Sequence, residues 1–216
     1  MKKYIISYVL LIITLMISTV FGLLWLFHFY IKQPWPNEAF YILTTMYIIM
    51  IGSTCLIFKT TELQTIHSHI GFHKFKLTGV LLAIILAIII WICDYFFQSN
   101  WLMIDLKQEA RDWYLKQNNL QLTFLTSVIL TPIIEEMLFR GILLKSFNLY
   151  LSKFWTTIII SFLFAIIHFE VLQIPTLFFA SALYVWLTFK YKSIIPAIIA
   201  HVMNNCFTFF YYIAMS

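Results

Sequence analysis

Long apolar runs alternate with short polar segments along most of the chain. A helix needs roughly 17–25 mainly apolar residues to cross about 30 Å of hydrocarbon. The pattern therefore predicts about seven membrane helices, at residues 5–30, 39–58, 77–97, 120–144, 154–169, 172–189 and 194–213. Because the fifth and sixth runs are joined by a very short turn, we expect six to eight spans in one all-α bundle.

Two polar segments interrupt this pattern. Residues 59–76 form a polar loop, and residues 101–119 place acidic and basic side chains among Trp and Leu at helical spacing. The second segment is too charged to span a bilayer, so we predict that it lies at the membrane interface. The first apolar run is longer than the apolar core of a signal peptide, and we interpret it as a retained anchor helix.

The composition agrees with a membrane protein. Hydrophobic residues make up 62% of the 216 residues and charged residues 11%, whereas soluble domains contain about 45–50% apolar and about 25% charged residues. The chain has too little charge for a soluble surface and too many aromatic residues for disorder. Its net charge of +5 comes from Lys and Arg in ones and twos, so no basic run is available to bind nucleic acid.

The basic residues are unevenly distributed between the two sides of the predicted bundle. If the N-terminus is cytoplasmic, the cytoplasmic set is Lys2, Lys3, Lys59, Lys74, Lys76, Lys145, Lys153, Lys190 and Lys192. The opposite set is Lys32, Lys107, Arg111 and Lys116. Since cytoplasmic segments carry the excess of Lys and Arg, we predict a multi-pass protein of the cell membrane with a cytoplasmic N-terminus.

The fourth apolar run contains charged residues, which are costly inside a bilayer and therefore suggest function. Successive helical residues are about 100° apart, so Glu136 and Arg140 share a face and can neutralise each other, while Glu135 points elsewhere. Pro132 removes one backbone donor close to these carboxylates. The alternative is a structural ion pair with a spare carboxylate at the membrane edge.

Two later runs contribute imidazoles and an amide. Phe164 and His168 share a helical face, as do His201 and Asn205. Taken singly, a buried His or an interhelical hydrogen bond explains each pair. Together with Glu135, however, these groups supply what a hydrolytic site needs, namely a general base, a proton donor and donors to an oxyanion. We therefore interpret them as one functional site inside the bundle.

The three motifs resemble those of one protease family. Glu-Glu-x-x-x-Arg at 135–140, Phe-x-x-x-His at 164–168 and His-x-x-x-Asn at 201–205 occur in this order on successive late helices. This arrangement resembles the CPBP family of intramembrane proteases, which comprises CAAX prenyl endopeptidases and the bacteriocin-processing or immunity-associated Abi proteins. The resemblance covers about residues 120–210. We treat residues 1–216 as one membrane domain, with helices without a motif at 1–98 and catalytic helices at 120–213.

The resemblance implies peptide-bond hydrolysis within a membrane cavity. Glu135 matches the carboxylate that activates water, and His168 assists it. The oxyanion is then held by His201 and Asn205, and Glu136 with Arg140 forms the supporting pair.

The resemblance leaves the use of a metal open. Family naming as metalloproteases would make Glu135, His168 and His201 zinc ligands, and catalytic zinc commonly takes three protein ligands. The sequence lacks a His-Glu-x-x-His helix, in which two ligands share one face. We favour the metal-free account, in which Glu135 and His168 polarise water.

We therefore expect an intramembrane endopeptidase that acts on a membrane-associated peptide or protein. The small size and lysine-poor outer segments resemble bacterial members, so bacteriocin or signal-peptide maturation, or self-immunity, is favoured over cleavage of prenylated CAAX substrates. The alternative is a non-catalytic membrane immunity or scaffold protein that uses the polar cluster to hold helices or a partner. A transporter is disfavoured because no internal repeat is present.

Overall fold

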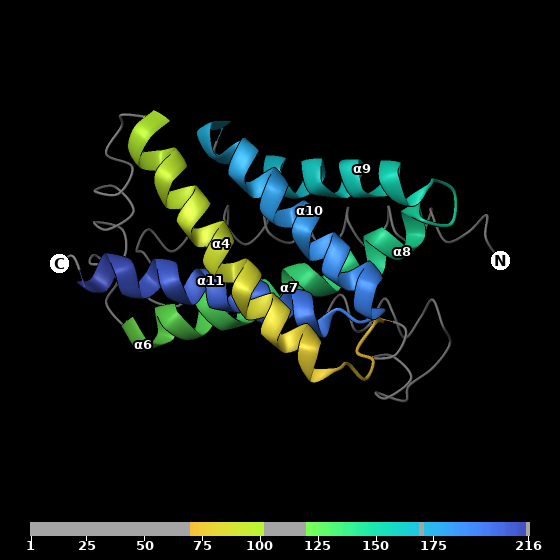
Figure 1. Ribbon diagram of the computed structural model, residues 1–216, viewed down its shortest axis with the longest axis horizontal. Coiled ribbons are helices and arrows are strands. Elements are labelled where there is room, and N and C mark those ends of the chain that lie inside the picture. Colours follow the sequence, from red (N-terminus) through yellow and green to blue (C-terminus); the bar gives the residue numbers. More distant parts are fainter. Residues whose placement is uncertain (1–69, 102–119, 169–170, 215–216) are drawn as a thin grey trace, which may run out of the picture.

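The computed structural model describes residues 70–101, 120–168 and 171–214, and every element within these ranges is helical (Figure 1). The predicted spans at 5–30 and 39–58 and the predicted interfacial segment lie outside the described residues. The first of these helices is α4 (Leu77–Trp101), and a second continuous helical segment covers Leu120–Phe147. The helices that follow are α9 (Lys153–Ile166), the short 3-10 helix η4 (Val171–Gln173), α10 (Ile174–Tyr191) and α11 (Ile195–Ala214).

Four of the described helical segments are long and apolar enough to cross a membrane, namely Leu77–Ser99, Leu120–Phe147, Val171–Tyr191 and Ile195–Ala214. They correspond to the third, fourth, sixth and seventh predicted spans. The fifth predicted span is a helix, but α9 has only 14 residues and a length of about 21 Å, which is less than the hydrocarbon thickness. The described residues thus confirm an all-α membrane bundle but not a count of seven spans.

The early end of α9 has a local cause at His168. In a continued α-helix, the carbonyl of Phe164 would accept the backbone N–H of residue 168. Here that carbonyl accepts from the His168 ring instead (2.7 Å), and the His168 backbone N–H turns to the carbonyl of Ala165 (3.4 Å). The helix therefore ends at Ile166 rather than at the predicted residue 169.

The helical segment Leu120–Phe147 changes its winding four times. It consists of α6 (Leu120–Thr123), π-helix η2 (Phe124–Leu130), α7 (Thr131–Glu136), π-helix η3 (Met137–Leu143) and α8 (Leu144–Phe147). Pro132 lies in the first turn of α7, where its missing N–H removes one helical hydrogen bond. The two glutamates thus close a short α-helical turn between two π-helical segments, a distortion that is frequent at functional sites.

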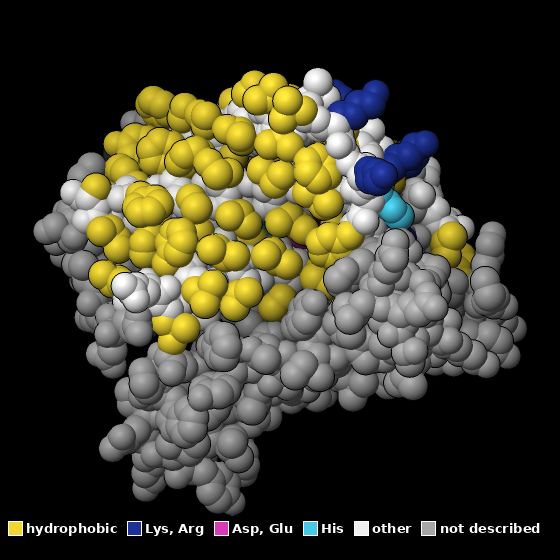
Figure 2. All heavy atoms as spheres, turned by 90° about the horizontal axis from the view of Figure 1, so that it is seen from below, with side chains coloured by type: hydrophobic (Ala, Val, Ile, Leu, Met, Phe, Trp, Pro, Cys, Tyr) yellow, Lys and Arg dark blue, Asp and Glu magenta, His cyan; other side chains and the backbone are white. Residues whose placement is uncertain are grey.

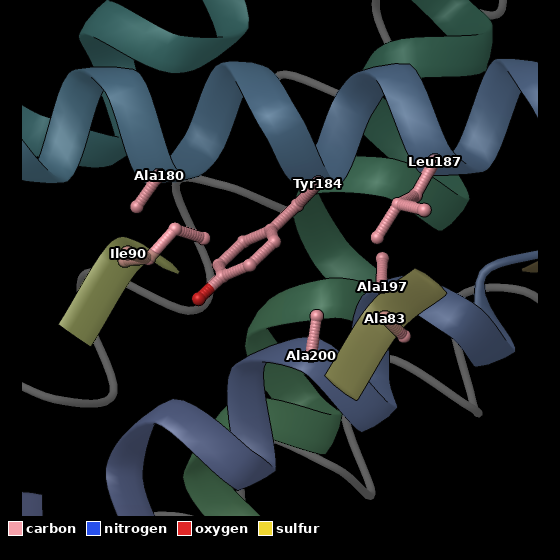
Figure 3. Packing of buried hydrophobic residues seen from close by; sticks show 7 residues of the cluster. All are labelled: Ala83, Ile90, Ala180, Tyr184, Leu187, Ala197 and Ala200. Carbon is pink, nitrogen blue, oxygen red and sulfur yellow. The ribbon is translucent and has the colours of Figure 1, made fainter. Parts of the chain in front are cut away.

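Helices α4, α10 and α11 pack closely because small residues lie where they meet. Ala83, Ala180, Ala197 and Ala200 are all buried in one cluster around Tyr184 (Figure 3). Without a side chain beyond Cβ, these positions let helix backbones approach in the way typical of membrane bundles. In Figure 1, α4 crosses α11 and α10 passes α9 at an angle, and these two pairs make the most extensive contacts of the described part.

The surface matches a lipid environment. Figure 2 shows a broad hydrophobic face with basic side chains at one end. Large exposed apolar side chains include Leu81 and Ile85 on α4, Trp155 on α9, and Phe179 on α10. At the basic end, Lys145, Lys153, Lys192 and His73 line one cavity. These three lysines, all from the predicted cytoplasmic set, therefore lie at one end of the described bundle.

Candidate active site

A cavity of about 470 Å³ lies between the helices. It is lined by side chains from α4, the segment Leu120–Phe147, α9, α10 and α11, with His168 following directly after α9. Four residues that the sequence proposed as catalytic line it together: Glu135, His168, His201 and Asn205. The tertiary packing thus gathers groups that are separated by up to 70 residues in the sequence.

The supporting pair lies behind this cavity. Glu136 Oε1 and Arg140 Nη1 are 3.0 Å apart, and both side chains are fully buried. Arg140 Nη2 also donates to the hydroxyl of Ser181 (2.8 Å) and to its carbonyl (3.2 Å) on α10. Because a buried charge is tolerated only when it is paired and hydrogen-bonded, this pair fixes the turn that carries both glutamates against α10.

His201 lies between the two glutamates. Its Nδ1 is 2.9 Å from Glu136 Oε1, and its Nε2 is 3.7 Å from Glu135 Oε2. Since an ionised carboxylate only accepts hydrogen bonds, Nδ1 carries the proton and donates to Glu136. The second ring nitrogen, Nε2, then faces Glu135. His201 thus connects the buried ion pair to the carboxylate in the cavity.

The two glutamates differ in environment although they are adjacent. The Glu135 side chain is 20% exposed, while that of Glu136 is 0% exposed. The rotation of about 100° per helical residue explains this difference. Glu136 is turned toward Arg140, and Glu135 is turned into the cavity, where water or a substrate can reach it. This is the division between the two carboxylates that helical spacing predicted.

A hydrogen bond to the last turn of α9 holds the His168 ring. Its Nδ1 donates to the carbonyl of Phe164, so in the neutral ring Nε2 remains as an acceptor. The ring of Phe164 lies 4.8 Å from that of His168 and 5.7 Å from that of His201. Phe164 therefore packs against both imidazoles, while Arg140 Cζ lies 4.7 Å from its ring centre.

Asn205 lines the cavity and also links two helices by a hydrogen bond. Its Nδ2 donates to the backbone carbonyl of Ser127 in η2 (3.1 Å). This is the interhelical hydrogen bond that the sequence left open as an alternative, and it ties α11 to the distorted helix. The Asn205 amide has a second N–H for a further partner.

Sequence reasoning missed three residues of this region. The Tyr184 ring stacks on His201 with ring centres 5.1 Å apart, and Ser181 accepts from Arg140. Both are neutral and common in membrane helices, so only their i,i+3 spacing on α10 could have indicated a shared face. Asp94 on α4 is the third, and it lines the cavity together with Glu135.

The sequence left Glu135, His168 and His201 open as zinc ligands. Across residues 70–101, 120–168 and 171–214, no group of three or more His, Cys, Asp or Glu side chains could hold a metal ion. Glu135, His168 and His201 line the same cavity without forming such a group.

The described helices thus define a membrane bundle with a carboxylate–imidazole cavity. Residues 117–207 match the family model of the type II CAAX prenyl endopeptidase Rce1-like proteins. This range contains all three motifs and confirms the resemblance to the CAAX protease family for that segment. The family is one of proteases, which supports a hydrolase at family level. No curated protein and no solved structure matches the chain.

Proposed function

We propose that this protein hydrolyses a peptide bond of a membrane-associated peptide or protein, with Glu135 as the general base. One observation carries the proposal. Glu135 Oε2 lies 3.7 Å from His201 Nε2 in an approximately 470 Å³ cavity that His168 and Asn205 also line. A carboxylate with access to the cavity, two imidazoles and an amide supply the groups that water activation and oxyanion binding need.

The first step is attack by water on the scissile carbonyl carbon. Glu135 takes one proton from the water, while the free Nε2 of His168 accepts a hydrogen bond from its second hydrogen and orients it. The carbonyl oxygen becomes an oxyanion. When the C–N bond breaks, the proton held by Glu135 passes to the leaving amine, which balances the reaction.

The charges of the network suggest how the oxyanion is stabilised. Glu135 and Glu136 carry two negative charges and Arg140 one positive charge, so one further proton makes this buried network neutral. Since His201 Nδ1 already donates to Glu136, His201 can donate to an oxyanion from Nε2 only when it carries this further proton. A His201 imidazolium donates from Nδ1 to Glu136 and from Nε2 to the oxyanion, and the second amide N–H of Asn205 is the other donor.

In the cell, we propose a role in bacteriocin or signal-peptide maturation, or in self-immunity, in a bacterial membrane. The rival function is a non-catalytic immunity or scaffold protein. The helix-linking contacts of Arg140 with Ser181 and of Asn205 with Ser127 favour this rival, since they show polar residues holding helices together. The two functions differ in whether Glu135 is needed when the protein level is normal.

Metal dependence is tested together with cleavage. Purified wild-type protein should cleave a candidate leader peptide in the presence of a chelator, since Glu135 and His168 activate water without a metal. We also expect far less than one zinc per molecule by elemental analysis. Stoichiometric zinc, lost together with activity on chelation and restored with it on zinc addition, would contradict the metal-free mechanism.

The proposed orientation has a separate test. With the N-terminus and the 59–76 loop in the cytoplasm, a Ser68→Cys variant should resist a membrane-impermeant thiol reagent in intact cells and react after permeabilisation. The natural cysteines Cys55, Cys93 and Cys206 are first replaced by Ser, and this background is the control. Efficient labelling in intact cells would overturn the orientation without affecting the proposed chemistry.

A further inference from the structure

We propose that Asp94 makes this protein select substrates that carry a positively charged side chain three or four residues from the scissile bond. The inference rests on the proposed function, because it concerns the substrate of the same cavity. Three observations support the inference: the position of Asp94 in the cavity wall, the charges of the residues that line the cavity, and the distance between Asp94 and His201 along the bundle.

Asp94 belongs to a face of α4 that lines the cavity. Ile90, Asp94 and Gln98 follow one another at i,i+4 spacing and all three line it. Gln98 Nε2 donates to Asp94 Oδ2 (2.8 Å), and this bond holds the carboxylate in place. Asp94 is therefore a positioned group of the cavity wall.

The second carboxylate oxygen has unused acceptor capacity. Asp94 Oδ1 is buried and makes no well-formed hydrogen bond in the described part of the chain, although the Thr176 side chain lies close enough to interact with this carboxylate. Thr176 also lines the cavity, but its hydroxyl donates to the carbonyl of Gln173 (3.0 Å). A buried acceptor without a donor is costly, and a cationic group of a bound substrate would supply the missing donor.

The charges in the cavity favour a cation. Its acidic side chains are Asp94 and Glu135, and neither Lys nor Arg is among its described lining residues. Arg140 lies behind the cavity, paired with Glu136, and Lys145, Lys153 and Lys192 line the other cavity at the basic end. A carboxylate within a membrane span normally has a partner. A substrate Lys or Arg would provide one, whereas a substrate carboxylate would be repelled.

The distance between Asp94 and His201 determines which residue of the substrate can reach Asp94. Tyr95, next to Asp94, contacts Tyr211 on α11 with ring centres 5.6 Å apart. Tyr211 follows His201 by ten residues, which corresponds to about 15 Å along the helix. Helical side chains lean toward the N-terminus, so the carboxylate lies roughly 10–13 Å from the centre of the reaction. An extended peptide advances about 3.3 Å per residue, which gives three or four residues.

The test uses peptides that differ at one position. Lys, Gln or Glu is placed in turn at the third and fourth residues on each side of the scissile bond, and kcat/KM is measured for each peptide. At one of these positions we expect the wild type to prefer Lys over Glu by about 10- to 100-fold, as a charge-assisted hydrogen bond provides. In Asp94→Asn this ratio should fall to near one, and in Asp94→Lys it should invert.

Two controls separate charge recognition from folding. Gln98→Ala removes the hydrogen-bond partner of Asp94 but keeps its charge, so the preference for Lys should persist. Asp94→Glu should also retain it. A wild-type ratio near one at all four positions, or an unchanged ratio in Asp94→Asn, would overturn the inference.

Failure of the proposed function is distinguished by a binding measurement. The same peptides are titrated into the Glu135→Gln protein, which should bind them without turnover. A preference for Lys in binding, together with absence of cleavage by the wild type, would support the role of Asp94 and refute hydrolysis. Equal binding of the Lys and Glu peptides would refute the role of Asp94 whatever the cleavage result.

Discussion

A Glu135→Gln protein should fold like the wild type and cleave its substrate about 10²- to 10⁴-fold more slowly, the usual loss when a general base is removed. Gln preserves the shape of the side chain and much of its hydrogen bonding, but it cannot take a proton from water. Glu135 is also partly exposed to the cavity, at 3.7 Å from His201, and the buried Arg140 keeps Glu136 as its direct partner. Single-turnover cleavage and thermal stability of the purified variant check both halves of this expectation.

The comparison with Asp94→Glu controls for a general sensitivity of the cavity. That change keeps the charge and leaves the base untouched, so its rate on a neutral peptide should exceed that of Glu135→Gln by a wide margin. A fully active Glu135→Gln protein would end the catalytic assignment and favour the scaffold function.

A Glu136→Gln protein should instead be destabilised, by roughly 3–5 kcal/mol, because a buried charge loses its partner. Glu136 is fully buried and contacts both Arg140 and His201, at 3.0 and 2.9 Å. Without that charge, the buried Arg140 guanidinium keeps its hydrogen bond to Ser181 and its contacts with aromatic rings but loses the carboxylate that neutralises it. The measurement is thermal stability in detergent, and activity should fall with it because His201 loses its anchor.

A double variant tests the physical reason for this loss. Replacing both partners, as in Glu136→Gln with Arg140→Met, removes the stranded charge and should recover part of the stability, since apolar replacement of a buried pair is often tolerated. Equal stability of wild type and Glu136→Gln would contradict the importance of the buried pair. A double variant less stable than Glu136→Gln would contradict the stranded-charge explanation.

The sequence predicted the parts of this site that depend on helical geometry. The apolar runs located α4, α10 and α11 to within a few residues of their observed ends, since chain length and hydropathy determine which segments span a membrane. The i,i+4 spacing likewise predicted the ion pair of Glu136 with Arg140 and the separate direction of Glu135. These features depend on neighbouring residues alone.

The features that the sequence did not predict depend on tertiary packing or on one local hydrogen bond. The end of α9 depends on the His168 ring taking the Phe164 carbonyl, which helical periodicity does not reveal. The contact of His201 with both glutamates requires α11 to approach the glutamate-bearing turn at one particular height. Ser181 and Tyr184 carry no charge that would mark them, and the direction of Asp94 depends on how α4 crosses α11.

The central claim is hydrolysis by Glu135, and cleavage in ¹⁸O-labelled water tests it most directly. Wild-type protein, reconstituted in lipid with a candidate peptide, should release two fragments, with one ¹⁸O atom in the new carboxyl terminus detected by mass spectrometry. The Glu135→Gln protein, at the same amount of folded material and the same time, should leave nearly all of the peptide intact. An intact peptide with the wild type, or the same labelled fragment from both proteins, would contradict the account.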